Sequence, residues 1–166
     1  MRRTFYLPYS PTGYMPEPQQ LTISEAHRRF AIEANNTAWK LIEQAKRSSD
    51  ENQNLLRAAH TSLYHWQQIG DGVHLQRGYC LLSHCYALLQ QTEQARYHAE
   101  QCLRLTHSEK VELFDYAYCY ETLSRVAALE GNDDDAHAYR QLALDIADEI
   151  TADEDKRIFM LDFNRP

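Results

Sequence analysis

Glycine and proline are scarce in this chain. Its 166 residues include only five glycines and five prolines, and four of the prolines lie within the first 18 residues. Both residue types interrupt helices, whereas alanine, leucine, glutamine and glutamate, which are frequent in the remainder, favour them. The sequence therefore predicts an all-α fold after about residue 22, and a chain of this length fits one domain.

Long apolar runs and paired cysteines are also lacking. No run approaches the roughly 18 apolar residues of a membrane-spanning helix, and the N-terminal stretch has no apolar core of signal-peptide length. The cysteines, which are Cys80, Cys85, Cys102 and Cys119, stand singly, without the paired spacing of a zinc or redox site. We therefore expect a cytoplasmic protein without a cofactor, whose cysteines serve as small apolar residues in a reducing compartment.

Basic residues are outnumbered by acidic ones. The formal net charge is −7 at pH 7, and residues 131–157 contain nine acidic residues against three basic ones. This sign of charge is unfavourable for binding the phosphates of a nucleic acid or an anionic membrane surface. We therefore expect no nucleic acid and no membrane among the partners.

Residues 1–22 differ in composition from the rest of the chain. Four prolines alternate there with the aromatic residues Phe5, Tyr6, Tyr9 and Tyr14. The prolines exclude a stable helix, so we expect an extended or polyproline-like N-terminal arm. A disordered tail is the alternative, although aromatic residues are scarce in disordered segments and favour contact with an apolar surface.

Six amphipathic helices are predicted after the arm, because apolar residues recur there at helical period. Their expected bounds within a helical domain of residues 23–150 are about 24–47, 51–69, 73–90, 92–106, 109–130 and 133–150. Ser24, Thr92 and Ser108 are suitable N-terminal caps for three of them. Residues 151–166 contain the apolar sequence RIFMLDF, so we expect a C-terminal segment that packs back on the domain.

A spacing pattern occurs twice in the predicted domain. In the third and fourth helices, Tyr79, Leu82-Ser83 and Tyr86 are followed by the small residues Ala95 and Ala99; in the fifth and sixth, Tyr120, Leu123-Ser124 and Ala127 are followed by Ala136 and Ala143. The pattern resembles the tetratricopeptide repeat, in which small residues let two helices approach closely. The second copy departs from it, since Ala127 replaces an aromatic residue and Arg140 replaces a large apolar one.

The resemblance implies both an architecture and a kind of function. The expected fold is three antiparallel helix pairs stacked as a right-handed superhelix, with a closed helical bundle as the alternative. The implied function is that of a non-enzymatic scaffold, which binds a peptide or protein through a concave groove. Such a resemblance implies no chemical reaction.

The groove predicted from this resemblance is lined by residues of the third and fifth helices. The candidates are Arg77, His84 and Leu88 from the third helix, and Tyr118, Glu121 and Arg125 from the fifth. The two arginines together with His84 suit a carboxylate or an acidic peptide, which they would bind by charge-assisted hydrogen bonds. The alternative is an ordinary solvated helix face.

Cys80 and His84 are four residues apart, so they lie on one helix face and provide two potential zinc ligands. A structural zinc needs four ligands and a catalytic one three, and no second pair with matching spacing occurs. We therefore expect no metal site. A small metal-dependent or acid–base enzyme centred on His84, with His60 or Cys80, stays an alternative to the scaffold.

Two further surfaces are candidates for contacts. The first helix carries Asn35, Asn36 and Trp39 on a second face, and we expect the N-terminal arm or a partner chain to cover Trp39. In the second helix, His60 and Tyr64 share one flank. A homodimer, or a self-assembling structural protein, is the third reading of these features.

Overall fold

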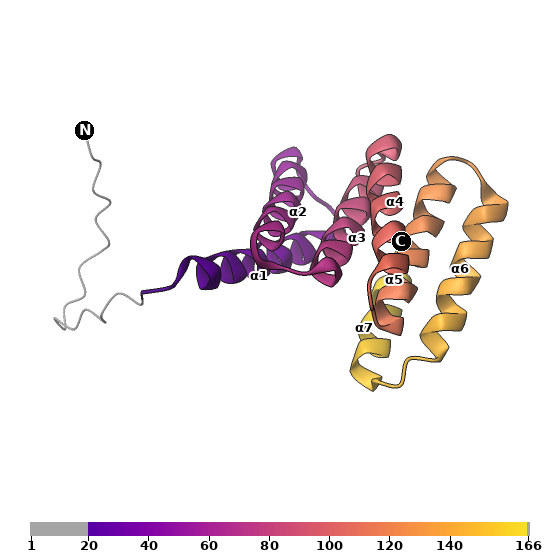
Figure 1. Cartoon of the computed structure of the whole chain (residues 1–166). Helices are drawn as coiled ribbons and strands as arrows, with labels where there is room; N and C mark the ends of the chain where they lie inside the picture. Colours follow the sequence, from indigo (N-terminus) through magenta and orange to yellow (C-terminus); the bar gives the residue numbers. More distant parts are fainter. Residues whose placement is uncertain (1–19, 166) are drawn as a thin grey trace.

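Seven helices and no strand make up residues 20–165, the part of the chain that the computed structural model describes (Figure 1). The helices are α1 (Ile23–Ile42), α2 (Ser49–Ile69), α3 (Gly72–Leu88), α4 (Thr92–Ser108), α5 (Leu113–Leu129), α6 (Asp133–Asp148) and α7 (Asp153–Phe163). The prediction of an all-α fold is confirmed. Nearly all of the expected N-terminal arm, residues 1–19, lies outside the described residues.

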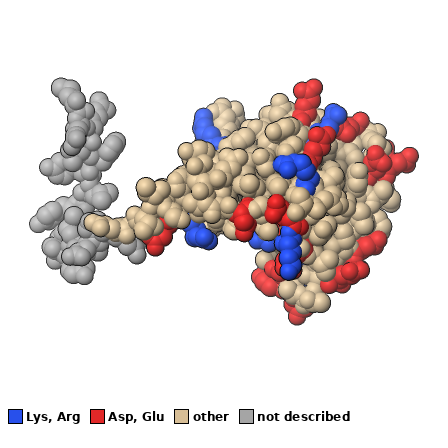
Figure 2. Space-filling model, viewed as in Figure 1, with Lys and Arg blue, Asp and Glu red and all other residues tan. Residues whose placement is uncertain are grey.

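The first six helices form three consecutive antiparallel pairs. α1 packs on α2, α3 on α4 and α5 on α6, and further contacts of α2 with α3, α4 with α5 and α3 with α5 join the pairs into one stack (Figure 1). α7 then lies against α5 and α6. Figure 2 shows that acidic side chains are frequent over the end of the molecule that holds α4 to α7, whereas the surface around α1 and α2 is mostly uncharged.

An equivalent hydrogen bond joins the two helices within the second pair and within the third pair. The Ser83 hydroxyl donates to the carbonyl of Ala95 at 2.7 Å, and the Ser124 hydroxyl donates to the carbonyl of Ala136 at 2.8 Å. In both cases the serine is the residue that follows the leucine of the repeated spacing pattern. The repeated pattern in the sequence therefore corresponds to a repeated contact in the structure.

Local hydrogen bonds set helix ends that differ from the predicted ones. α1 ends at Ile42 instead of residue 47, because Arg47 folds back and its guanidinium donates to the carbonyls of Leu41 and Gln44 at 3.0 and 2.9 Å. α5 begins at Leu113 instead of residue 109. The Asp115 carboxylate accepts from the backbone N–H of Glu112 at 3.2 Å and fixes this start.

The three predicted N-terminal caps are wrong. α1 is capped by Thr22, whose side chain accepts from the backbone N–H of Glu25. Thr92 is the first residue of α4 rather than its cap, and Ser108 is the last residue of that helix. The sequence offered several adjacent polar residues at each of these points, and pattern alone did not distinguish between them.

The C-terminal segment packs on the stack through α7. Phe159 is fully buried and Phe163 is 3% exposed. The ring of Phe159 meets that of Tyr118 edge-on, with 5.1 Å between the ring centres. The described part of the segment that was expected to pack back is thus a helix with two aromatic anchors.

Candidate functional site

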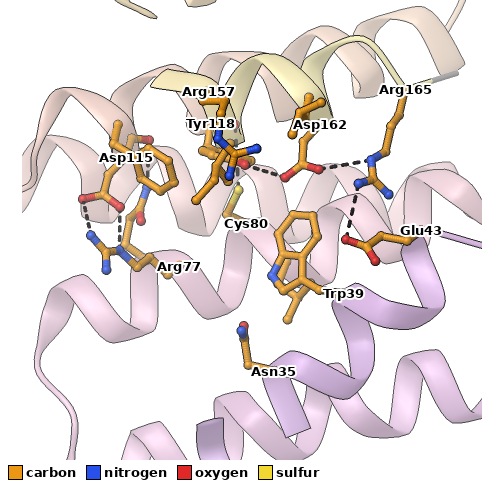
Figure 3. A pocket seen from close by; sticks show the side chains of 15 residues that line it. Asn35, Trp39, Glu43, Arg77, Cys80, Asp115, Tyr118, Arg157, Asp162 and Arg165 are labelled. Carbon is orange, nitrogen blue, oxygen red and sulfur yellow. Dashed lines mark hydrogen bonds and ion pairs between the residues drawn. The ribbon is translucent and has the colours of Figure 1, made fainter. Parts of the chain in front are cut away.

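A cavity of about 500 Å³ opens between α7 and the first helix of each pair. Its walls come from α1 and the residue after it, from α3, from α5 and from α7 (Figure 3). Cavities of roughly 300–1,000 Å³ are the usual size for binding sites of small ligands and short segments. This space is therefore the principal candidate site in the described part of the chain.

Hydrogen bonds of Tyr118 and Arg125 hold α7 over the cavity. The Tyr118 hydroxyl donates to Asp162 Oδ2 at 2.6 Å, and burial together with this bond raises the pKa of Tyr118. The Arg125 guanidinium donates to the carbonyls of Asp162 and Arg165, at 3.3 and 3.4 Å, at the end of α7. These bonds fix the helix that forms one wall of the cavity.

Three ion pairs, two of which share Arg165, lie at the rim of the cavity (Figure 3). Arg77 of α3 binds Asp115 of α5 through two nitrogens, with Nε–Oδ1 at 2.6 Å and Nη2–Oδ2 at 3.1 Å. The Asp115 side chain is only 1% exposed, whereas that of Arg77 is 54% exposed. Arg165 bridges Asp162 of α7, at 3.1 Å, and Glu43 at the end of α1, at 3.4 Å. The rim is thus composed of charged groups already held in place.

The buried side chain of Gln76 makes hydrogen bonds behind this rim. Its amide nitrogen donates to the hydroxyl of Thr106 at 3.0 Å and to the backbone carbonyl of Asp115 at 3.2 Å. Its amide oxygen is buried and has no hydrogen-bond partner within the described residues. Gln76 therefore connects α3 with α4 and α5 and leaves one acceptor unused beside the cavity.

The inner walls of the cavity are largely apolar. Trp39 from α1, Phe114 from α5, and Ile158 and Leu161 from α7 all line it. Ile158 is 37% exposed and Leu161 is 55% exposed, so α7 presents two large apolar side chains that its own fold leaves partly open. An apolar group placed between α1 and α7 would remove this surface from water.

The predicted groove residues divide into two sets. Arg77 and Tyr118 line the cavity. His84, Leu88, Glu121 and Arg125 do not line it, contrary to the expectation. The reason is that α3 and α5 pack against each other and against their neighbouring pairs, so positions beside the predicted stripe are also buried.

His84 illustrates this difference most clearly. It is 2% exposed, and its ring lies edge-on to that of Trp39 with 5.7 Å between the ring centres. Burial lowers the pKa of His84 to about 3, and the positive charge of Arg125 acts in the same direction. The imidazole is therefore neutral and lies behind Trp39 rather than at the surface of the cavity.

Glu121 and Arg125 bind each other instead of a groove ligand. They form an ion pair one helical turn apart in α5, and Glu121 is 3% exposed. Burial raises the pKa of Glu121, against the opposing effect of Arg125. Leu88 packs half-buried into the apolar core formed by α1, α2 and α3.

The second set of predicted contact residues is also divided. Asn35 and Trp39 line the cavity, and Asn36 is exposed. Trp39 is half-buried against α3 and α5 of its own chain, with 6.2 Å between its ring centre and that of Tyr118. Within residues 20–165, part of the Trp39 side chain is therefore covered by α3 and α5, and the predicted cover by residues 1–19 lies outside the described residues.

His60 and Tyr64 do not approach His84. The His60 ring nitrogen Nε2 lies 2.8 Å from the Tyr86 hydroxyl, and Tyr64 is 56% exposed. His98 lies beside this pair, with its ring stacked on that of Tyr86 at 5.3 Å. The flank belongs to a separate aromatic surface of α2, α3 and α4.

Sequence reasoning found Arg77 but missed the other four charged residues of the rim, Glu43 among them. Asp115, Asp162 and Arg165 were not candidates, because each acts through a partner on another helix. The one available signal was the apolar sequence RIFMLDF, which predicted that α7 packs back but not onto which face.

Residues 20–165 contain no group of three or more histidine, cysteine, aspartate or glutamate side chains arranged to hold a metal ion. The Cys80 thiol, one of the two potential zinc ligands, lies 3.3 Å from the Thr122 hydroxyl. Among the helices of the same residues, none combines the length and the apolar character needed to cross a membrane.

No protein-family model, no curated protein and no solved structure matches this chain. The function proposed below therefore rests on the geometry of the cavity.

Proposed function

We propose that this protein is a non-enzymatic helical-repeat scaffold that binds a peptide segment of a partner protein in the cavity between α1 and α7. The observation that carries the proposal is the pair of partly exposed apolar side chains on α7, Ile158 and Leu161, which line the same cavity as Trp39 and Phe114. Apolar side chains of a peptide would fill the space between them, as anchor residues do in other peptide grooves.

The arrangement of the helices supports this reading. Two helix pairs share the serine-to-alanine hydrogen bond at positions 41 residues apart, Ser83 and Ser124. We infer a tetratricopeptide-like right-handed superhelix, in which α1, α3 and α5 line the inner face. α7 covers part of that face, so the proposed peptide site is the remaining space between α1 and α7.

The polar groups of the cavity suit a peptide main chain. Asn35 lines the cavity on α1, and its side-chain amide offers both a donor and an acceptor. The rim arginines are already held by Asp115 and Asp162, so a peptide would meet a rigid frame. Rigid frames reduce the entropy lost on binding.

We also infer a reducing compartment such as the cytoplasm. All four cysteines are unpaired and buried, which is the usual state of cysteines in reducing surroundings.

Selection of displayed random peptides on the immobilised full chain tests the proposal. We expect enriched peptides that share an apolar position and that bind Leu161→Glu at least about tenfold more weakly, because the new charge lies in the apolar wall. Leu142→Glu is the matched control, since Leu142 is 39% exposed on α6 and lies outside the cavity. Failure to enrich any peptide, or an equal loss with both variants, would contradict the proposal.

A further inference from the structure

A second hollow, of about 410 Å³, lies between α5 and α6 at the C-terminal end of α7. Four basic side chains line it, Arg125, His137, Arg140 and Arg165, against one acidic side chain, Asp133. A concentration of basic groups is unexpected in a chain whose formal net charge is −7. We call this second hollow the basic hollow.

Two of the four basic groups are occupied by the chain itself. Arg125 pairs with Glu121 and also donates to two backbone carbonyls of the α7 end. Arg165 pairs with Asp162 and Glu43. These two arginines shape the hollow but have little capacity left for an additional acid.

Arg140 is different. Its guanidinium carbon lies 3.9 Å from the centre of the Phe163 ring, a cation–π contact. It has no ion pair and no side-chain hydrogen bond within residues 20–165. Contact through the face of the guanidinium leaves the N–H groups at its edge available for a carboxylate.

His137 lies one helical turn before Arg140, so the two side chains share a face of α6. Arg140 also occupies the position at which the repeat pattern of the sequence has a large apolar residue. α6 thus departs from the repeat pattern at Arg140. Among the arginines of the basic hollow, Arg140 is the one that has no ion pair within the described residues.

We propose that the basic hollow binds an acidic side chain of the same peptide whose apolar residues occupy the cavity between α1 and α7. This inference rests on the proposed peptide-binding function and names the chemistry of the peptide. Arg165 lines both the cavity and the basic hollow, so the two spaces adjoin at this residue. Because the chain as a whole carries a formal net charge of −7, an acidic peptide residue is favoured at this concentration of basic groups over the rest of the surface, which fixes the register of the peptide.

The experiment compares peptide selection on the full chain, on Arg140→Gln and on Arg104→Gln. Arg104 is an exposed arginine of α4 whose side chain bonds only to Gln101 among the described residues, and it serves as the control. We expect the wild-type chain and Arg104→Gln to select peptides with an apolar position and an acidic one at fixed spacing. Arg140→Gln should select the apolar position alone.

A synthetic peptide from the selection provides the second measurement. Replacing its acidic residue by the matching amide should weaken binding to the wild-type chain at least about tenfold, and binding to Arg140→Gln less than about twofold. If the amide peptide binds the wild-type chain as tightly as the acidic one, the inference is overturned whatever the variant does.

The possible failures are distinguishable. Enriched peptides without an acidic preference would overturn the inference about the basic hollow and leave the peptide-binding function intact. An acidic preference that persists with Arg140→Gln would place the acid elsewhere and also overturn the inference. Enrichment of no peptide would remove the proposed function and the inference together.

Discussion

At the scale of single residues, the structure separates charged groups that shape the site from groups that are free to bind. Arg77 was a candidate for holding a ligand carboxylate, yet its two inner nitrogens already bind the buried carboxylate of Asp115. Arg125, the second candidate arginine, is likewise already paired with the buried carboxylate of Glu121. Intramolecular ion pairs thus occupy the arginines that the sequence offered for an acid, and Arg140 is left without such a pair within the described residues.

His84 carries a prediction about acid stability. Its pKa falls from 6.5 to about 3 in the folded protein, mainly because burial disfavours the charged form. As the pH falls from about 7 to about 5, the unfolded chain gains a proton at this position and the folded protein does not. His84 should therefore remove about 2 kcal/mol of stability over this range, and none of that loss is recovered below pH 3.

Urea unfolding at several pH values measures this effect. His84→Gln, which cannot titrate, should lose about 2 kcal/mol less than the wild-type chain between pH 7 and pH 5. His107→Gln is the control, because His107 is exposed on α4. His98, whose pKa is lowered to about 4, contributes in the same direction in all three proteins and cancels in the comparison. Parallel pH profiles for His84→Gln and the wild-type chain would show that His84 is not buried as a neutral ring.

At the scale of the helices, sequence periodicity predicted the number and order of the first six, because an amphipathic helix leaves a regular apolar signal. The predicted end of α1 and the predicted start of α5 were wrong, since they depend on hydrogen bonds that the side chains of Arg47 and Asp115 make with nearby backbone groups. The repeat pattern predicted the close approach at Ala95 and Ala136. It did not predict that flanking positions such as His84 are buried, because that depends on neighbouring helix pairs.

We predict that Phe159 anchors α7 on the stack, so that α7 is a stable wall of the cavity. Phe159 is fully buried against Tyr118, so Phe159→Ala should destabilise the protein by about 3–5 kcal/mol, or release α7 locally at lower cost. Leu161→Ala on the same helix should cost far less, because Leu161 is 55% exposed. Hydrogen exchange of the α7 amides, combined with chemical unfolding, distinguishes global from local loss. Equal protection of α7 in both variants would show that Phe159 does not anchor it.

At the scale of the whole molecule, the cavity is assembled from helices far apart in the chain. Arg165 and Glu43, which close one side of it, are 122 positions apart. Periodicity within one helix carries no information about such a contact. The sequence therefore predicted individual helices that line the cavity, but not the cavity that they form together. Trp39 was recognised as an unusual surface residue, and the fold turns it toward that space (Figure 3).

The central claim is that a peptide binds between α1 and α7, and the two tryptophans of the chain provide its most direct test. Trp39 lines the cavity, whereas Trp66 packs on His74 in a separate part of the stack, with 4.1 Å between the ring centres. Two indole N–H signals are therefore expected in an NMR spectrum, and Trp66→Phe assigns them. On addition of a selected peptide, the Trp39 signal should shift and saturate while the Trp66 signal stays in place. Saturable binding that leaves the Trp39 signal unmoved would contradict the account.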